Sequence, residues 1–420
     1  MSVLELFKID KKLCAFANKA EKMCAQVFME IEAVAEYHQQ RMLKAFIDSK
    51  VSERHFCAST GYGYGDDGRD KLDEIYSRVF EAEDALVRHN FTSGTHALTV
   101  ALFGMLRPGD TLICVTGEPY DTLKGVIGFE RNAPGSLKEF GINYQQINLT
   151  SIGKPDYNEI EKAIKPSSTL IYLQRSRGYS LRSSLCANEI SKISKLSKKL
   201  SPNCVVMLDN CYGEFVEAEE PLSLGVDLIA GSLIKNPGGG VARSGGYIAG
   251  KKDLVEKCAH RLGAPGTGRE VGATLGHNRE LFMGAFHAPH VTGEALKSAI
   301  FSAALFELMG YDVTPRYDDT RSDITQAIRF GNEERLVAFC QGLQKGSPID
   351  AFLKPEPWDM PGYENKVIMA AGTFTQGASI ELSADAPLRE PYSVWLQGGL
   401  NFHSAKVGIL MAAEEVLKLK

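Results

Sequence analysis

The stretch from Asn203 to Gly240 reads NCVVMLDN, then CYGEFVEAEEPLSLG, then VDLIAGSLIKNPGGG, and it decides the fold. Its two apolar runs, Cys204–Leu208 and Val226–Ala230, are short and rich in β-branched residues, which favours strands over helices. Continuous apolar runs of this length are typical of parallel strands that are buried on both faces of an α/β sheet. Because ligands bind at the carboxyl ends of such strands, we expect a site where the two runs end.

Each run is followed by a residue that can take part in chemistry. Asp209 ends the first, and Lys235 follows the second. This pair suits pyridoxal phosphate, because a carboxylate can pair with the protonated pyridine nitrogen while a lysine amine bonds covalently to the aldehyde carbon. Ser232, in Ser-x-x-Lys spacing, is a candidate to hydrogen-bond the phosphate. The glycines Gly238 to Gly240 would let the loop pass close to the ring without a Cβ clash.

These residues carry a family resemblance. Asp209 with Ser232-Leu-Ile-Lys235 resembles the core of fold-type-I pyridoxal phosphate enzymes, in the branch that contains cystathionine lyases and methionine gamma-lyase. Lys235-Asn-Pro-Gly-Gly-Gly, followed by Ser244-Gly-Gly-Tyr-Ile-Ala-Gly, is similar to a narrower group, the methionine gamma-lyase-like proteins often labelled aluminium resistance proteins. The similarity runs from about Phe56 to the C-terminus. It implies an α/β protein whose large domain has a mostly parallel sheet, and a homo-oligomer, expected to be a tetramer built from dimers.

We expect three parts in the chain. Residues 1–50 form a helical segment, residues 51–290 the cofactor-binding domain, and residues 291–420 a smaller α+β domain. The boundary falls near Val291-Thr-Gly, after a segment 257–290 that is rich in Gly, His and Arg and is expected to be irregular. The smaller domain is expected to contain helices and strands at Glu294–Met309, Asn332–Lys345, Lys366–Ala371, Ser379–Ser383, Tyr392–Gln397 and from about Ser404.

Composition excludes several classes of protein. A net charge of -5 over 420 residues gives no reason to expect nucleic acid or another polyanion as a partner. No apolar run approaches membrane-spanning length, and the first residues lack a signal-peptide core. The nine cysteines are scattered, odd in number and without a Cys-x-x-Cys pair, so we expect neither a zinc site nor a disulfide framework. We therefore expect a cytoplasmic enzyme without a bound metal.

Two further segments match the family's cofactor site. Ser93-Gly94-Thr95 opens a predicted helix, whose free N–H groups and positive dipole end can bind a phosphate. Tyr120 follows the predicted strand Thr111–Val115, where the resemblance implies an aromatic ring stacked on the cofactor. That phenol can also pass a proton to a departing group, but acting as a base would require cationic neighbours to lower its pKa from about 10.

The segment from Gly63 to Gly68 matches the dinucleotide-binding pattern G-x-G-x-x-G, but we reject that interpretation. No strand precedes it, and its aspartates would repel a pyrophosphate. The resemblance implies instead a loop whose Tyr and Arg reach the phosphate on a neighbouring subunit. Tyr64 and Arg69 are the candidates, with Tyr62 as a rival to Tyr64. A solvent-exposed turn remains the alternative.

In the smaller domain, Arg389 is the candidate to hold the substrate α-carboxylate, a role that suits a bidentate guanidinium. The resemblance then implies a lyase that removes a β- or γ-substituent from a sulfur-containing L-amino acid, releasing ammonia and a 2-oxo acid. Lys235 would act as general base, with a pKa expected to fall well below about 10.4, and Asp209 and Tyr120 would support it.

Alternatives remain open at this point. The cofactor also serves transaminases, racemases and aldol-type lyases, and the fold does not separate them. A non-catalytic stress-response relative is a further possibility, against which the intact Asp209 and Lys235 argue. Ser-x-x-Lys is also the spacing of penicillin-binding enzymes, but the chain has no downstream Lys-Thr-Gly.

Overall fold

The computed structural model describes residues 6–129, 133–360 and 363–419, so the first five residues of the predicted N-terminal segment lie outside it. The larger sheet has the strand order β1-β7-β6-β5-β4-β2-β3. Strands β3, β2, β4, β5 and β6 are mutually parallel, while β7 runs antiparallel to β6 and β1. The strand bounds are β1 Asp84–Arg88, β2 Thr111–Cys114, β3 Asn143–Gln146, β4 Leu170–Gln174, β5 Val205–Asp209, β6 Leu228–Ser232 and β7 Gly246–Gly250. The predicted α/β class with a mostly parallel sheet is confirmed.

Helices cover both faces of this sheet, because alternate side chains of the buried strands need apolar partners on each side. One face packs on α4 (Gly94–Met105), α5 (Asp121–Ile127) and α8 (Lys252–Leu262). The other face packs on α3 (Asp67–Val79), α6 (Tyr157–Ala163), α7 (Ala187–Leu200) and the first turns of α9 (Asn278–Leu308). Both predicted central strands are therefore fully covered, as their uninterrupted apolar runs indicate.

The smaller sheet is antiparallel, with the order β10-β11-β12-β9-β8. Its elements are β8 Asp312–Thr314, β9 Gln326–Arg329, α10 Glu333–Lys345, β10 Val367–Ala370, β11 Ser383–Pro387, β12 Ser393–Gln397 and α11 Phe402–Leu417. The predicted strand Ser379–Ser383 is wrong, because β11 begins at Ser383. The residues before it form a loop in which the Glu381 carboxylate accepts hydrogen bonds from the backbone N–H groups of Phe374 and Thr375.

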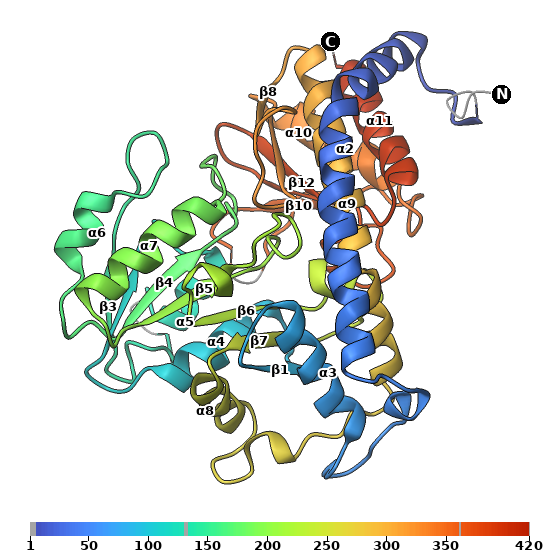
Figure 1. Ribbon diagram of the computed structural model, residues 1–420. Coiled ribbons are helices and arrows are strands. Elements are labelled where there is room, and N and C mark those ends of the chain that lie inside the picture. Colours follow the sequence, from blue (N-terminus) through green and yellow to red (C-terminus); the bar gives the residue numbers. More distant parts are fainter. Residues whose placement is uncertain (1–5, 130–132, 361–362, 420) are drawn as a thin grey trace.

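Two long helices, α2 (Lys11–Asp48) and α9, run side by side and connect the larger sheet to the smaller one (Figure 1). The expected irregular segment 257–290 is wrong at both ends, which belong to α8 and α9, while residues 263–277 between them are irregular apart from one short 3-10 turn. The expected helix start at Glu294 is also wrong, because α9 begins at Asn278 and passes through Pro289. Tertiary packing holds this helix together where its Gly and Pro content argues against one. Val291 thus lies within a helix, and the division of the chain there stays a prediction.

The glycines after Lys235 are needed by contacts within the chain. A Cβ on Gly239 would overlap the Gly284 carbonyl oxygen of α9, and one on Gly240 would overlap the Leu400 side chain. Conversely, a Cβ on Gly284 would lie 3.1 Å from the Gly238 carbonyl carbon and closer still to its oxygen. The structure thus gives these glycines a role in close packing on α9 and Leu400, while the expected room for the ring stays a prediction.

We predict that Gly284→Ala lowers the free energy of unfolding by about 1–3 kcal/mol, because the added methyl group overpacks the contact with Gly238. Thermal and urea unfolding measure the change. Gly125→Ala is the matched control, since Gly125 is exposed in α5 and a Cβ there meets no atom within 4 Å. The control should gain up to about 1 kcal/mol of helix stability. Equal stability of the two variants would contradict the tight contact.

Candidate active site

The carboxyl ends of β5 and β6 bring Asp209 and Lys235 into one site. Asp209 is the last residue of β5 and pairs in register with Ala230 of β6, while Lys235 lies just beyond the end of β6. The Lys235 Nζ lies 3.8 Å from the centre of the Tyr212 ring and 3.5 Å from the Ser379 Oγ. Ser379 belongs to the loop that precedes β11. The part of the chain that forms the smaller sheet therefore contributes to the surroundings of Lys235.

The Asp209 carboxyl group is 5% exposed and held in place by two donors. The Cys211 N–H donates to its Oδ1 at 3.0 Å, and the Tyr172 hydroxyl donates to its Oδ2 at 3.4 Å. Burial raises the pKa of Asp209, while these donors and the Lys235 ammonium oppose the rise. A buried carboxylate is costly without a cationic partner, so a protonated pyridine nitrogen would stabilise it here.

The pKa of Lys235 departs from the expectation. Burial disfavours the ammonium, but Tyr212, Cys211 and Asp209 outweigh it, and the pKa of Lys235 is raised above its ordinary value. The predicted lowering by burial and nearby arginines is therefore wrong for this chain. The physical reason is that the neighbours of Lys235 favour its positive charge, so burial does not decide the outcome alone.

The predicted phosphate cup lies beside this lysine. Ser93 caps α4, its Oγ accepting from the His96 N–H at 3.1 Å, and the helix N-terminus faces β6. A Cβ on Gly94 would lie 3.1 Å from the Ser232 Cβ, so the bare glycine keeps this space open. The Ser232 hydroxyl is buried and has no partner among the described residues. A phosphate would satisfy it, so Ser93, Gly94 and Ser232 fit pyridoxal phosphate. The Thr95 hydroxyl instead bonds to Thr122 at 2.7 Å.

Tyr120 precedes α5, and its backbone N–H donates to the Gln174 Oε1 at 2.7 Å. Its hydroxyl lies 3.0 Å from that of Tyr363. Burial, followed by Tyr363 and Tyr212, raises the pKa of Tyr120 well above its ordinary value. The phenol is thus protonated at neutral pH and suits proton donation, whereas the lowering that base catalysis would need is absent among the described neighbours.

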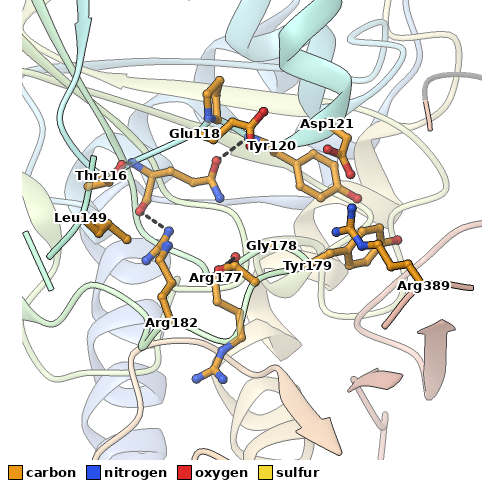
Figure 2. A pocket seen from close by; sticks show the side chains of 13 residues that line it. Thr116, Glu118, Tyr120, Asp121, Leu149, Arg177, Gly178, Tyr179, Arg182 and Arg389 are labelled. Atoms are coloured by element: carbon orange, nitrogen blue, oxygen red, sulfur yellow. Dashed lines mark hydrogen bonds between the residues drawn. The ribbon is translucent and has the colours of Figure 1, made fainter. Parts of the chain in front are cut away.

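A cavity of about 180 Å³ lies against Tyr120. Figure 2 shows Tyr120, Tyr179 and Arg389 on one side of it, with the Arg177 guanidinium turned away. Arg177 donates to the Thr314 carbonyl at 2.7 Å, and Arg182 donates to the Gln174 carbonyl at 3.1 Å. Arg389 is exposed and lines this cavity, but Lys235, Asp209 and Ser232 are not among its lining residues, so contact of Arg389 with a substrate carboxylate stays a prediction.

The structure does not bring Tyr64 and Arg69 to the Lys235 site of the same chain. Tyr62 and Tyr64 stack on each other and are 72% and 67% exposed. Arg69 is buried, and its Nη1 donates to the Gly63 and Gly272 carbonyls at 3.0 and 3.1 Å. Arg69 therefore holds its own loop closed. Contact of these residues with a neighbouring subunit stays a prediction.

Sequence reasoning missed several residues of the site. Gln174 could have been found, because it is the polar residue that ends the buried strand β4. Tyr212, Ser379 and Asp385 carry no such signal, since they lie on loops or on the smaller sheet and reach Lys235 only in the folded chain. Among the described residues, no group of three or more His, Cys, Asp or Glu side chains is arranged to hold a metal ion.

The fold and site define a pyridoxal phosphate enzyme of fold type I. A structure of similar fold is that of apo CalE6, a methionine gamma lyase from Micromonospora echinospora, with a TM-score of 0.55, 16% identity and coverage of 86% of this chain and 93% of that chain. The family model for methionine gamma-lyase matches residues 13–417. The chain therefore belongs to the methionine gamma-lyase family, and this membership implies use of pyridoxal phosphate.

Closer relatives extend over the whole chain. A carbon-sulfur lyase involved in aluminum resistance from Clostridium novyi NT has a structure with a TM-score of 0.94 and 50% identity, covering 98% of this chain and 97% of that chain. The uncharacterized protein YnbB of Bacillus subtilis is 48% identical over 404 residues, which is 96% of either chain. The resemblance to methionine gamma-lyase-like proteins labelled for aluminium resistance is thereby confirmed.

We predict that Ser232→Ala weakens pyridoxal phosphate binding roughly tenfold or more, because a buried hydroxyl that can donate to a phosphate is lost. Titration of the cofactor's visible absorbance measures the dissociation constant. Ser302→Ala is the matched control, since the Ser302 hydroxyl on α9 is also buried without a partner among the described residues but lies away from Lys235. Equal affinity of Ser232→Ala and the native chain would contradict the assignment of the phosphate site.

Proposed function

We propose that this protein is a pyridoxal phosphate-dependent carbon–sulfur lyase acting on a sulfur-containing L-amino acid and releasing ammonia and a 2-oxo acid. One observation carries the proposal: Lys235 and Asp209 meet at the strand ends, and the protonated Tyr120 phenol lies near Tyr212, whose ring contacts Lys235. The family and the name of the Clostridium novyi relative support the same class of reaction.

The cofactor, when bound, supplies an electron sink that makes the substrate Cα proton acidic. Lys235 would hold the cofactor and then accept that proton. Asp209 would keep the ring nitrogen protonated, since burial makes an uncompensated carboxylate costly. Arg389 would hold the α-carboxylate.

Tyr120 would complete the reaction by donating its phenolic proton to the departing sulfur. The raised pKa of this phenol keeps the proton in place at neutral pH, and the Gln174 side chain fixes the backbone that carries it. A donor at the leaving group favours elimination over transamination, racemisation or aldol cleavage, none of which expels a sulfur substituent. The 2-oxo acid that forms will show whether the substituent departs from the β or the γ carbon.

We also propose a homo-oligomer, a tetramer built from dimers, that works in the cytoplasm. The exposed Tyr62–Tyr64 pair supports association, because large aromatic side chains are enriched at protein interfaces. All nine cysteines are free thiols, which fits a reducing compartment. Within the part of the chain that the structure describes, no helix combines the length and apolar character that membrane crossing requires.

We predict that purified protein loaded with pyridoxal phosphate releases ammonia and a 2-oxo acid from at least one of cystathionine, methionine, cysteine and homocysteine. Lys235→Ala should lower the rate roughly 100-fold or more, because the base and the covalent attachment are both lost. Lys199→Ala, an exposed lysine on α7, is the control and should keep the native rate. No 2-oxo acid from a fully loaded protein would refute the proposed function.

We predict that Tyr120→Phe still exchanges the Cα proton with deuterated solvent but forms 2-oxo acid roughly 100-fold more slowly, since only the proton for the leaving group is lost. The native enzyme should show no alkaline loss from Tyr120 below about pH 10, because the raised pKa keeps the phenol protonated there. Tyr363→Phe is the control, because it removes the hydroxyl that contacts the Tyr120 phenol and leaves the Tyr120 phenol itself in place. Equal loss of exchange and elimination would show that Tyr120 acts before the leaving group departs.

A further inference from the structure

Asp385 is a second carboxylate that reaches the site, and it comes from the smaller sheet. In β11, Ala384 and Ala386 are buried in the core under α10 and α11. Successive side chains of a strand point to opposite faces, so Asp385 points away from that core. It is also the only residue of β11 that is partly accessible. On that face the Tyr179 hydroxyl, from the loop after β4, donates to the Asp385 Oδ2 at 3.0 Å.

One oxygen of Asp385 is held while the other is available. The Gln397 Nε2 also donates to Oδ2 at 3.0 Å, so two donors fix the carboxylate through a single oxygen. Oδ1 accepts no hydrogen bond from the residues that the structure describes. Lys235 lies near this part of the chain, because its Nζ is 3.5 Å from the Oγ of Ser379, four residues before β11. Burial raises the pKa of Asp385, and the Lys235 ammonium opposes that rise. A carboxylate with one fixed and one available oxygen is arranged to receive a donor.

The smaller sheet thus presents two opposite charges to the site. Asp385 lies in the middle of β11, and Arg389 follows two residues after the strand ends and lines the cavity at Tyr120. An α-amino acid carries an ammonium and a carboxylate on one carbon, so it complements such a pair. Tyr179 links the two, because it lines the same cavity and donates to Asp385.

We propose that Asp385 binds the ammonium group of the incoming amino acid through Oδ1 and directs its nitrogen toward Lys235, while Arg389 holds the carboxylate. This inference rests on the proposed function, because it takes the substrate to be an amino acid. The arrangement selects amino acids over carboxylic acids that lack the amine. It also makes the approach of the smaller sheet to the larger one a requirement for substrate binding, since Asp385 and Lys235 lie on different sheets.

The test compares two ligands that differ only in the amine, L-norleucine and hexanoate, on the cofactor-loaded full chain. Asp385→Asn should weaken L-norleucine binding roughly 10- to 100-fold and leave hexanoate unchanged, because a hydrogen bond to a charged group is lost for the amine alone. Calorimetry measures both affinities, with cofactor content checked by absorbance. If Asp385→Asn does not fold, Asp385→Glu serves in the same comparison, because it keeps the charge but displaces the oxygen.

Tyr179→Phe is the matched control for a merely structural role. It removes one of the two donors to Oδ2 and keeps the carboxylate, so it should weaken L-norleucine binding less than Asp385→Asn does and leave hexanoate unchanged. Equal weakening of both ligands by Asp385→Asn, or unchanged L-norleucine binding, would overturn the inference. If the native protein released no 2-oxo acid and Asp385 still controlled the preference for L-norleucine, the proposed function would fail and this inference would stand.

Discussion

The structure depends on the burial of charge at the carboxyl edge of the larger sheet. Asp209 is buried and Lys235 is partly buried, and isolated charges that are withdrawn from water are unfavourable by several kcal/mol each. The surrounding groups offset this cost in different ways. The Tyr212 ring lies against the ammonium, and the Cys211 N–H and Tyr172 hydroxyl donate to the carboxylate. Among the residues that the structure describes, the Ser232 hydroxyl has no partner, and a phosphate would supply one.

Close backbone packing places these charges. The loop after Lys235 contacts α9 so tightly that glycine is required on both sides, at Gly239 and at Gly284. Since α9 continues into the smaller domain, the position of Lys235 is coupled to that of the smaller sheet (Figure 1). The site therefore receives residues from the segments of both sheets, which α9 and α2 connect. Ser379 and Asp385 reach the same lysine from the smaller sheet because of this coupling.

The local sequence pattern predicted the carboxyl edge of the larger sheet, where Asp209 and Lys235 lie, because the residues that mark this edge are close together in the sequence. The apolar runs of β5 and β6 end in polar residues, and parallel strands bring those ends together without further information. Ser93 at the start of α4 was predictable for the same reason, as a cap residue that opens a helix. The bounds of α9 and β11 were not predictable, because Gly284 and Pro289 oppose a helix locally and the alternation around Ser379 does not show where strand pairing begins.

The sequence by itself determined the fold class, the cofactor chemistry and the roles open to Lys235, Asp209 and Ser93, since these follow from strand-end placement. Only the tertiary structure decided the protonation of that site and the purpose of its glycines. Burial has the largest effect on the pKa of Lys235 and of Tyr120, followed by Tyr212 and Tyr363 respectively, and such contacts between distant segments leave no trace in local spacing. For the same reason, Asp385 became visible only once the smaller sheet was folded against the larger one.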